Sequence, residues 1–147
     1  MKKVVAIMLF SLAFALSSVA KINWEKYENA FKKAKKENKL IMIYIYSPEC
    51  HYCKEMEKTT FQDKEVQRTV NKYFVPIKVR KCSEDGLEIR KEYGYLGTPT
   101  FHFVEANGKK IKSIFGAWKK EDFLKILKFF YEEHYKNKSM TDYFMEN

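Results

Sequence analysis

The sequence is poor in side chains that bind metal ions, with only three cysteines and three histidines among 147 residues. Two of the cysteines, Cys50 and Cys53, form a Cys-x-x-Cys pair, and a zinc site built on this pair would need two further ligands. The remaining thiol and imidazole side chains belong to Cys82, His51, His102 and His134, and none of them lies at the spacing of a zinc ribbon. We therefore expect no metal site, and the cysteine pair requires another explanation.

Long apolar stretches are also scarce, and the one near the N-terminus is too short to span a bilayer. Two lysines precede an apolar run from Val4 to Leu16, and small residues follow at Ser18-Val19-Ala20. This order is typical of a secretory signal peptide with its cleavage site. We expect residues 1–20 to be removed and residues 21–147 to form one periplasmic or secreted domain; an uncleaved membrane anchor is the alternative.

Acidic residues are in the minority, because 28 Lys and Arg stand against 19 Asp and Glu and give a net charge of +9. A basic chain can bind nucleic acid, but no nucleic-acid-binding module is recognisable in this sequence. The lysines also follow predicted helical faces, as at Lys32, Lys33, Lys35 and Lys36, instead of alternating with aromatic residues. We expect a solvated basic surface that favours acidic partners or an anionic membrane surface, and no nucleic-acid partner.

The odd number of thiols leaves one cysteine outside a simple disulfide framework in a chain that we expect to be exported. If Cys50 pairs with Cys53, the remaining thiol is Cys82. It follows a predicted strand, and the C-terminal ends of parallel strands share one edge of a sheet, so we expect it on the same side as Cys50. Cys82 is a candidate third redox thiol or intermolecular bridge, and an inert or buried cysteine is the alternative.

Hydrophobic periodicity predicts an α/β fold. The expected helices cover Trp24–Asn38, the segment after Cys53, Asp63–Tyr73, Leu87–Tyr93 and Lys119–Lys136, and the expected strands cover Leu40–Tyr46, Phe74–Val79, Thr100–Val104 and Lys110–Phe115. Pro76 indicates that the second strand lies at an edge or begins there, because proline cannot donate to a neighbouring strand. Residues 82–86 are expected to be a loop, and the tail 137–147 carries no clear signal. The order predicts a central mixed sheet of about four strands flanked by helices.

The cysteine pair lies where an apolar strand meets a helix, a position that suits redox chemistry. If Cys50 begins the helix, unpaired backbone N–H groups and the helix dipole stabilise its thiolate and lower its pKa. Cys53 lies nearly one turn further and can attack a mixed disulfide on Cys50. We therefore assign Cys50 as the nucleophile and Cys53 as the resolving thiol; a purely structural disulfide is the alternative.

The neighbours of the two thiols are expected to tune their redox behaviour. A protonated His51 would favour the Cys50 thiolate, whereas Glu49 would oppose it. Tyr52, held between the two cysteines, is expected to be exposed. A second stretch, Gly97-Thr98-Pro99, precedes an apolar strand, where a cis X–Pro bond can occur.

Together these features resemble a thioredoxin-fold protein over essentially the whole of residues 21–147. The segment Thr60–Val66, shortly after Cys53–Glu57, further resembles the thioredoxin-like C-terminal domain of the bacterial transmembrane thiol:disulfide reductase (DsbD). The resemblance implies that Pro99 is the cis-proline beside the active site and that Thr98 offers backbone hydrogen bonds to a partner. It also implies electron exchange with disulfide-containing exported proteins, a membrane-embedded electron donor, and no cofactor.

The sequence departs from the thioredoxin pattern at three places. Glu49 stands where many thioredoxins have Trp, His51-Tyr52 replaces Gly-Pro, and Tyr44 occupies the position of a buried acid that assists proton transfer. An acid–base helper is therefore unassigned. We expect an exported thiol:disulfide oxidoreductase working in the reductive direction. A periplasmic oxidant or isomerase is one alternative, and a non-catalytic binding or assembly module is another; the sequence does not indicate an oligomeric state.

Overall fold

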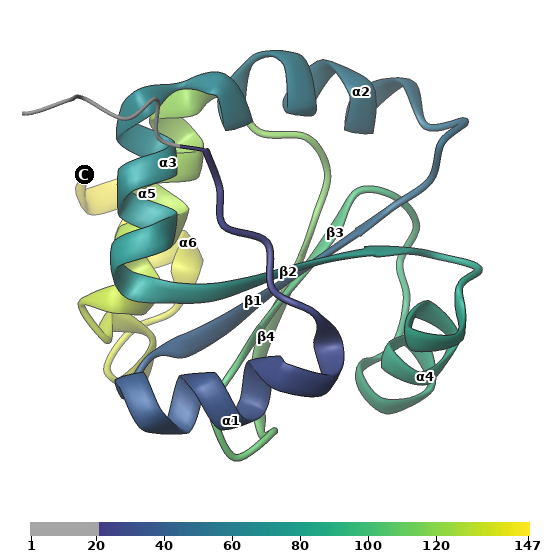
Figure 1. The fold of residues 1–147 in the computed structure, drawn as a ribbon. Coiled ribbons are helices and arrows are strands. Elements are labelled where there is room, and N and C mark those ends of the chain that lie inside the picture. Colours follow the sequence, from purple (N-terminus) through teal and green to yellow (C-terminus); the bar gives the residue numbers. More distant parts are fainter. Residues whose placement is uncertain (1–20) are drawn as a thin grey trace, which may run out of the picture.

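A computed structural model of the chain describes residues 21–147. The predicted signal peptide, residues 1–20, lies outside the described residues. The structure contains one four-stranded sheet in the order β2-β1-β3-β4 (Figure 1). Strand β1 (Leu40–Tyr46) runs parallel to β2 (Phe74–Arg80) and antiparallel to β3 (Thr100–Val104), and β3 forms a hairpin with β4 (Lys110–Phe115). The predicted mixed sheet of four strands is confirmed.

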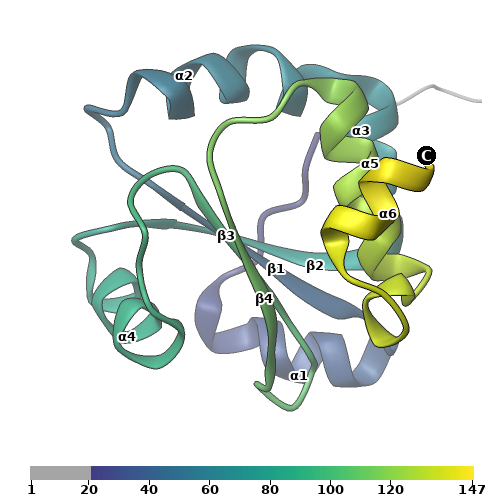
Figure 2. The same ribbon diagram turned by 180° about the vertical axis from the view of Figure 1, so that it is seen from behind.

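Helices cover both faces of this sheet (Figures 1 and 2). One face packs against α1 (Tyr27–Glu37) and α4 (Glu84–Tyr93). The other face packs against α2 (His51–Lys58), α3 (Lys64–Tyr73), α5 (Lys120–Tyr131) and α6 (Met140–Glu146). Two short 3₁₀ turns, η1 (Thr60–Gln62) and η2 (His134–Lys136), follow α2 and α5. This is a three-layer α/β arrangement.

Strand β1 is the centre of the fold because its side chains enter both cores. Met42 and Tyr44 pack into the core under α2, α3 and α5. Ile41, Ile43 and Ile45 pack into the core under α1 and α4. All five are fully buried, which explains why the strand reads as an uninterrupted apolar run.

Pro76 lies on an edge strand, as its chemistry predicted. It pairs with Met42 of β1 on one side. On the other side its carbonyl accepts a hydrogen bond from the backbone N–H of Glu25 at 2.7 Å. The nitrogen and carbonyl of a strand residue point to the same side, so the nitrogen of Pro76 also faces away from β1, and its missing N–H removes no hydrogen bond between β1 and β2.

The predicted starts of two helices are wrong. Helix α1 begins at Tyr27 and not at Trp24, because Glu25 forms a parallel bridge with Ile77 and holds the chain extended. Helix α4 begins at Glu84, inside the predicted loop 82–86, because the Ser83 hydroxyl accepts a hydrogen bond from the N–H of Gly86. A serine cap of this kind satisfies an N–H that has no partner within the helix.

The C-terminal region also differs from the prediction. Helix α5 ends at Tyr131, before the predicted Lys136, and Glu133 then adopts a left-handed conformation with φ of 58°. The tail forms a further helix, α6, whose N-terminus is capped by Ser139. Tyr143 of this helix is buried against Phe129 of α5, and Figure 2 shows the two helices side by side.

Candidate functional site

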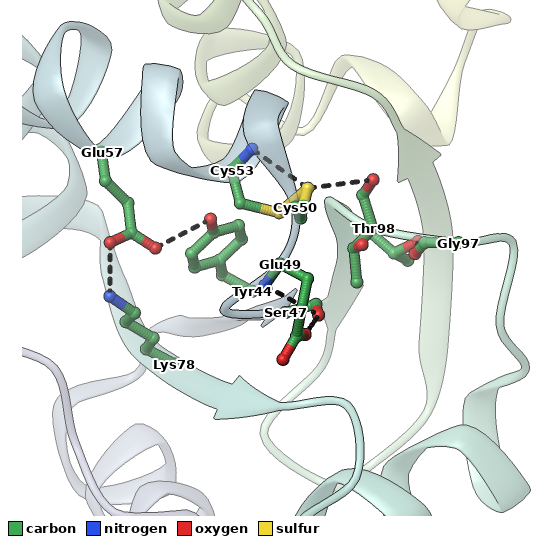
Figure 3. Close-up of a disulfide and its surroundings, with 10 residues drawn as sticks. Tyr44, Ser47, Glu49, Cys50, Cys53, Glu57, Lys78, Gly97 and Thr98 are labelled. Atoms are coloured by element: carbon green, nitrogen blue, oxygen red, sulfur yellow. Dashed lines mark hydrogen bonds and ion pairs between the residues drawn. A yellow bond between two sulfur atoms is a disulfide. The ribbon is translucent and has the colours of Figure 1, made fainter.

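The two cysteines form a disulfide at the N-terminus of α2 (Figure 3), where β1 ends. Their Cα atoms are 5.3 Å apart. Cys50 is the N-cap residue, and its Sγ accepts a hydrogen bond from the backbone N–H of Cys53 at 3.1 Å. The sulfur of Cys50 therefore faces a backbone donor and the positive end of the helix dipole, which both stabilise a thiolate.

The two sulfurs differ in access to solvent. Cys50 is partly exposed, whereas Cys53 is 1% exposed and packs in the core. A partner protein can therefore reach the sulfur of Cys50 but not that of Cys53. This asymmetry suits a nucleophile at Cys50 and a resolving thiol at Cys53.

The loop between α4 and β3 lies against Cys50. The carbonyl oxygen of Thr98 is 3.4 Å from the Cys50 Sγ, although the two residues are 48 positions apart in the sequence. The Thr98–Pro99 peptide bond is cis. The loop is held by the Thr100 hydroxyl, which donates to the Gly97 carbonyl at 2.6 Å, and by the N–H of Gly116, which donates to the Pro99 carbonyl at 3.0 Å. The structure thus brings together the two stretches singled out in the sequence.

The residues expected to tune the pair lie on the outside of the site. Glu49 is exposed and hydrogen-bonded to the Ser47 hydroxyl, and this bond holds the pKa of Glu49 below its usual value. Positive charge on Arg80 and Lys81 acts in the same direction. His51 and Tyr52 are both exposed, with their rings 5.8 Å apart. A carboxylate therefore stands beside Cys50 at neutral pH.

Tyr44, at the position of the missing acid, contacts an acid from another element. Its hydroxyl donates to Oε1 of Glu57 at 3.1 Å, and Oε2 of Glu57 pairs with the ammonium of Lys78 at 2.9 Å. Figure 3 shows the Tyr44 ring beside the disulfide, with its hydroxyl directed toward Glu57. Burial, and next the charge of Glu57, raise the pKa of Tyr44, so it stays protonated.

Glu57 was not identified from the sequence. It lies four residues after Cys53 on α2, so both side chains project from the same face of the helix. This spacing of four residues was the only signal in the sequence from which Glu57 could have been assigned to the site. The rotation of α2 that places Glu57 over Tyr44 is a tertiary feature, which the spacing alone does not fix.

Cys82 is a free, exposed thiol, so of the expected alternatives a buried cysteine is wrong, while an inert surface thiol and a third redox thiol both stay predictions. It follows β2, and the N–H of the preceding Lys81 donates to the carbonyl of Tyr46 at 2.9 Å. This hydrogen bond places the loop after β2 beside the end of β1, at the edge that also carries Cys50. Whether Cys82 exchanges with the pair remains a prediction.

The other histidines pack against protein groups. His102 is fully buried on β3, with its Nδ1 2.8 Å from the Ser113 hydroxyl. His134 pairs with Glu132 at 2.9 Å near the end of α5. Within residues 21–147, the structure contains no group of three or more His, Cys, Asp or Glu side chains arranged to hold a metal ion.

Comparisons with known proteins agree with this geometry. The family model described as a thioredoxin-like domain matches residues 27–131. The thiol:disulfide interchange protein DsbD of Colwellia psychrerythraea is 34% identical over 86 residues, which make up 57% of this chain but only 14% of that protein.

Two solved structures are similar over most of the chain. The solution structure of a thioredoxin from Thermus thermophilus superposes with a TM-score of 0.66 and 30% identity, covering 76% of this chain and 86% of the other. The oxidised C-terminal domain of DsbD from Neisseria meningitidis gives a TM-score of 0.54 and 25% identity, covering 74% of this chain and 89% of the other.

None of the helices within residues 21–147 is long and apolar enough to cross a membrane.

Proposed function

This chain belongs to the thioredoxin-like domain family, and from that premise we propose that it reduces disulfide bonds in exported proteins. The fold and the Cys50–Cys53 pair support thiol–disulfide exchange. The observation that carries the proposal is the asymmetry of the pair. Cys50 is accessible at a helix N-terminus, and Cys53 is buried behind it.

The exchange takes two steps and transfers two electrons. In the first, the Cys50 thiolate attacks a partner disulfide, a bond forms between the two sulfurs, and the other partner sulfur leaves as a thiolate. In the second, the Cys53 thiolate attacks Cys50, the mixed disulfide breaks, and the second partner thiol is released. The protein is left with the Cys50–Cys53 disulfide, and no cofactor takes part.

The partner chain is proposed to dock on the loop that carries Thr98. The Thr98 carbonyl lies next to the reactive sulfur, and an extended partner segment could pair with the Thr98 backbone in an antiparallel manner. Pro99 holds this backbone in place from a buried position. Contacts to main-chain atoms would accept many partner sequences.

The reductive direction rests on the likeness to DsbD. Reduction of partners leaves the pair oxidised, so a membrane-embedded donor of two electrons would have to restore the dithiol. His51, Glu49 and Tyr52 surround Cys50 and are proposed to set the reduction potential. A second candidate, a disulfide oxidant or isomerase, is favoured by His51, whose protonated ring would stabilise a Cys50 thiolate.

Trapping tests the exchange chemistry. A Cys53→Ser variant cannot complete the second step, so it should accumulate mixed disulfides with partners through Cys50. A Cys50→Ser variant, which keeps the buried thiol, serves as the matched control and should trap none. Failure of the wild-type protein to reduce insulin, together with no adducts of Cys53→Ser, would favour a non-catalytic binding module.

A further inference from the structure

Lysines gather around two neighbouring hollows at the end of the molecule that lies away from the disulfide. The larger hollow has a volume of about 690 Å³ and the smaller one of about 280 Å³. Both are lined by Glu105 and Tyr135, so they form one continuous surface, which we call the basic surface. The lysines that line it are Lys35, Lys39, Lys72, Lys109, Lys110, Lys112, Lys136 and Lys138.

Positive charge dominates the basic surface. Its eight lysines face only three acidic side chains that line the same hollows, Glu37, Glu105 and Glu133. Three of the lysines form an ion pair with a glutamate. Within residues 21–147, the other five have no carboxylate within ion-pair distance. These unpaired ammonium groups can attract an anionic partner.

The type of basic residue favours a lipid surface over a protein partner. Every basic side chain that lines the two hollows is a lysine, although the chain also contains Arg68, Arg80 and Arg90. Lysine is a hydrated point charge and is depleted at protein interfaces, where the planar fork of arginine is enriched. Within the described residues, none of the strongly exposed large apolar side chains lines this surface. Binding here would therefore be electrostatic.

Tyrosine rings accompany the lysines. Tyr73 and Tyr131 line the larger hollow and stack with their ring centroids 4.0 Å apart, and both are partly exposed. The ammonium of Lys72 lies 4.9 Å from the centroid of the Tyr73 ring. Tyrosine rings and long lysine stems suit the boundary between lipid and water, because each has an apolar body and a polar tip.

The basic surface and the exchange site lie at opposite ends of β1. Leu40, the first residue of this strand, lines the larger hollow, whereas Cys50 follows its last residue, Tyr46. A strand of seven residues spans about 20 Å. Figure 1 shows α2, which begins after Cys50, at one end of the molecule and the turn of the β3–β4 hairpin at the other. Anything held by the basic surface therefore leaves Cys50 free.

We propose that the basic surface binds anionic phospholipid headgroups, so that the protein docks on a membrane with its disulfide turned toward water. The inference goes beyond the proposed exchange activity and does not depend on it. Headgroup phosphates would attract the unpaired ammonium groups, each contributing about fivefold to the binding constant. Docking would keep the protein close to a membrane-embedded electron donor, while exported partners reach Cys50 from the aqueous side.

Co-sedimentation of the purified protein with lipid vesicles tests the docking. The protein should bind vesicles of equimolar phosphatidylglycerol and phosphatidylcholine, but not vesicles of phosphatidylcholine alone. Raising the salt from about 0.1 M to about 1 M should release it, because the Debye length falls from about 10 Å to about 3 Å. Equal binding to both kinds of vesicle, binding that survives the high salt, or no binding at low salt would overturn the inference.

A triple variant assigns the binding to the basic surface. Lys72→Gln, Lys109→Gln and Lys112→Gln together remove three exposed charges, at positions where substitutions are expected to leave the fold intact. At about fivefold for each lysine, the variant should bind anionic vesicles about 100-fold more weakly.

The matched control removes the same charge from the other end of the molecule. Lys58→Gln, Lys64→Gln and Lys119→Gln change exposed lysines at the end of α2 and the starts of α3 and α5. This variant should keep most of the binding. An equal loss in the two triple variants would show that net charge alone governs binding, which would overturn the proposed surface.

Thiol labelling tests the orientation without requiring any disulfide exchange. Cys50 and Cys82 of the reduced protein should react with a polyethylene glycol maleimide as fast on anionic vesicles as in solution, because both lie at the far edge of the sheet. Protection of both thiols by the vesicles would place that edge on the membrane and contradict the inference. A protein that binds poly-glutamate but no anionic vesicle would assign the surface to an acidic protein instead. If the protein docks as proposed but reduces no disulfide, only the proposed function fails.

Discussion

The Tyr44 hydroxyl donates a hydrogen bond to Oε1 of Glu57 at 3.1 Å, beside the Cys50–Cys53 disulfide. Tyr44 is fully buried, and Glu57 is also paired with Lys78. The site therefore has a carboxylate on α2 that contacts the buried tyrosine, where the thioredoxin pattern would place the acid directly on β1. The hydrogen bond to Glu57 gives the hydroxyl of this large buried ring an acceptor.

Replacing Tyr44 by Phe should destabilise the fold by about 1.5 kcal/mol, the low end for a hydrogen bond to a charged group, because the bond from the buried hydroxyl to Glu57 is lost while the ring keeps its packing. Glu57 keeps its ion pair with Lys78, so no charge is left unpaired. Urea denaturation measures the change. Tyr46→Phe is the control, because Tyr46 lies two residues further along β1 on the same face of the sheet and is only partly buried. An equal loss of stability in both variants would contradict the role of the Glu57 contact.

Gly97→Ala should destabilise the protein more than Gly94→Ala does. Both glycines have positive φ values, 126° and 88°, which an alanine adopts only with strain. At Gly97 the added methyl group would also lie 2.9 Å from the Phe115 ring, whereas at Gly94 nothing lies within 4 Å. We expect an excess cost of up to about 1 kcal/mol for Gly97→Ala, the low end of the range for overpacking, because the half-exposed ring of Phe115 can turn away from the methyl group.

A double-mutant cycle separates the two causes. If the ring contact contributes, Phe115→Ala should reduce the cost of Gly97→Ala, since the methyl group then has room. Thermal or urea unfolding of the four proteins provides the comparison. Strict additivity of the two substitutions would contradict a contact between the methyl group and the ring.

The buried His102 should make the protein less stable in acid. Burial, with a smaller contribution from the positive charge of Lys110, lowers the pKa of His102 to about 4, whereas an unfolded histidine has a pKa near 6.5. The unfolded chain therefore binds an extra proton between these values, and the free energy of unfolding falls as pH drops from about 6.5 to about 4. The total loss is about 3 kcal/mol.

Urea denaturation across this pH range checks the assignment. His102→Gln should flatten the dependence of the unfolding free energy on pH, even if it lowers stability at every pH. His134→Gln serves as the control, because His134 is only partly buried and pairs with Glu132. If the dependence of the unfolding free energy on pH persists in His102→Gln, or is lost in His134→Gln, a group other than His102 is responsible.

Cys82 is expected to be dispensable for the exchange between Cys50, Cys53 and a partner. Its thiol is exposed and free, and the buried Cys53 is the proposed resolving thiol. Cys82→Ser should reduce insulin at a rate within about twofold of wild type, since the attacking and resolving thiols are unchanged. A loss of tenfold or more, or a Cys50–Cys82 disulfide found by mass spectrometry in a Cys53→Ser variant, would instead identify a third redox thiol.

The local features of the site were predictable because each depends on a short stretch of sequence. The run Leu40–Tyr46 followed by the cysteine pair predicted a strand and a helix N-terminus, and Pro76 predicted an edge strand. Contacts such as Tyr44 with Glu57 and Phe115 with Gly97 were not predictable, because they depend on the rotation of α2 and the register of the β3–β4 hairpin. Helix α6 was missed because seven residues give little periodicity, although Ser139 was a cap signal.

The reduction potential of the Cys50–Cys53 pair tests the central claim most directly. Equilibration of the protein with dithiothreitol or glutathione buffers, followed by quantification of the dithiol, gives this potential. The account predicts a reducing pair with a potential near that of thioredoxin, about −270 mV. A value near about −120 mV, as in a strong disulfide oxidant, would contradict the proposed direction of electron flow.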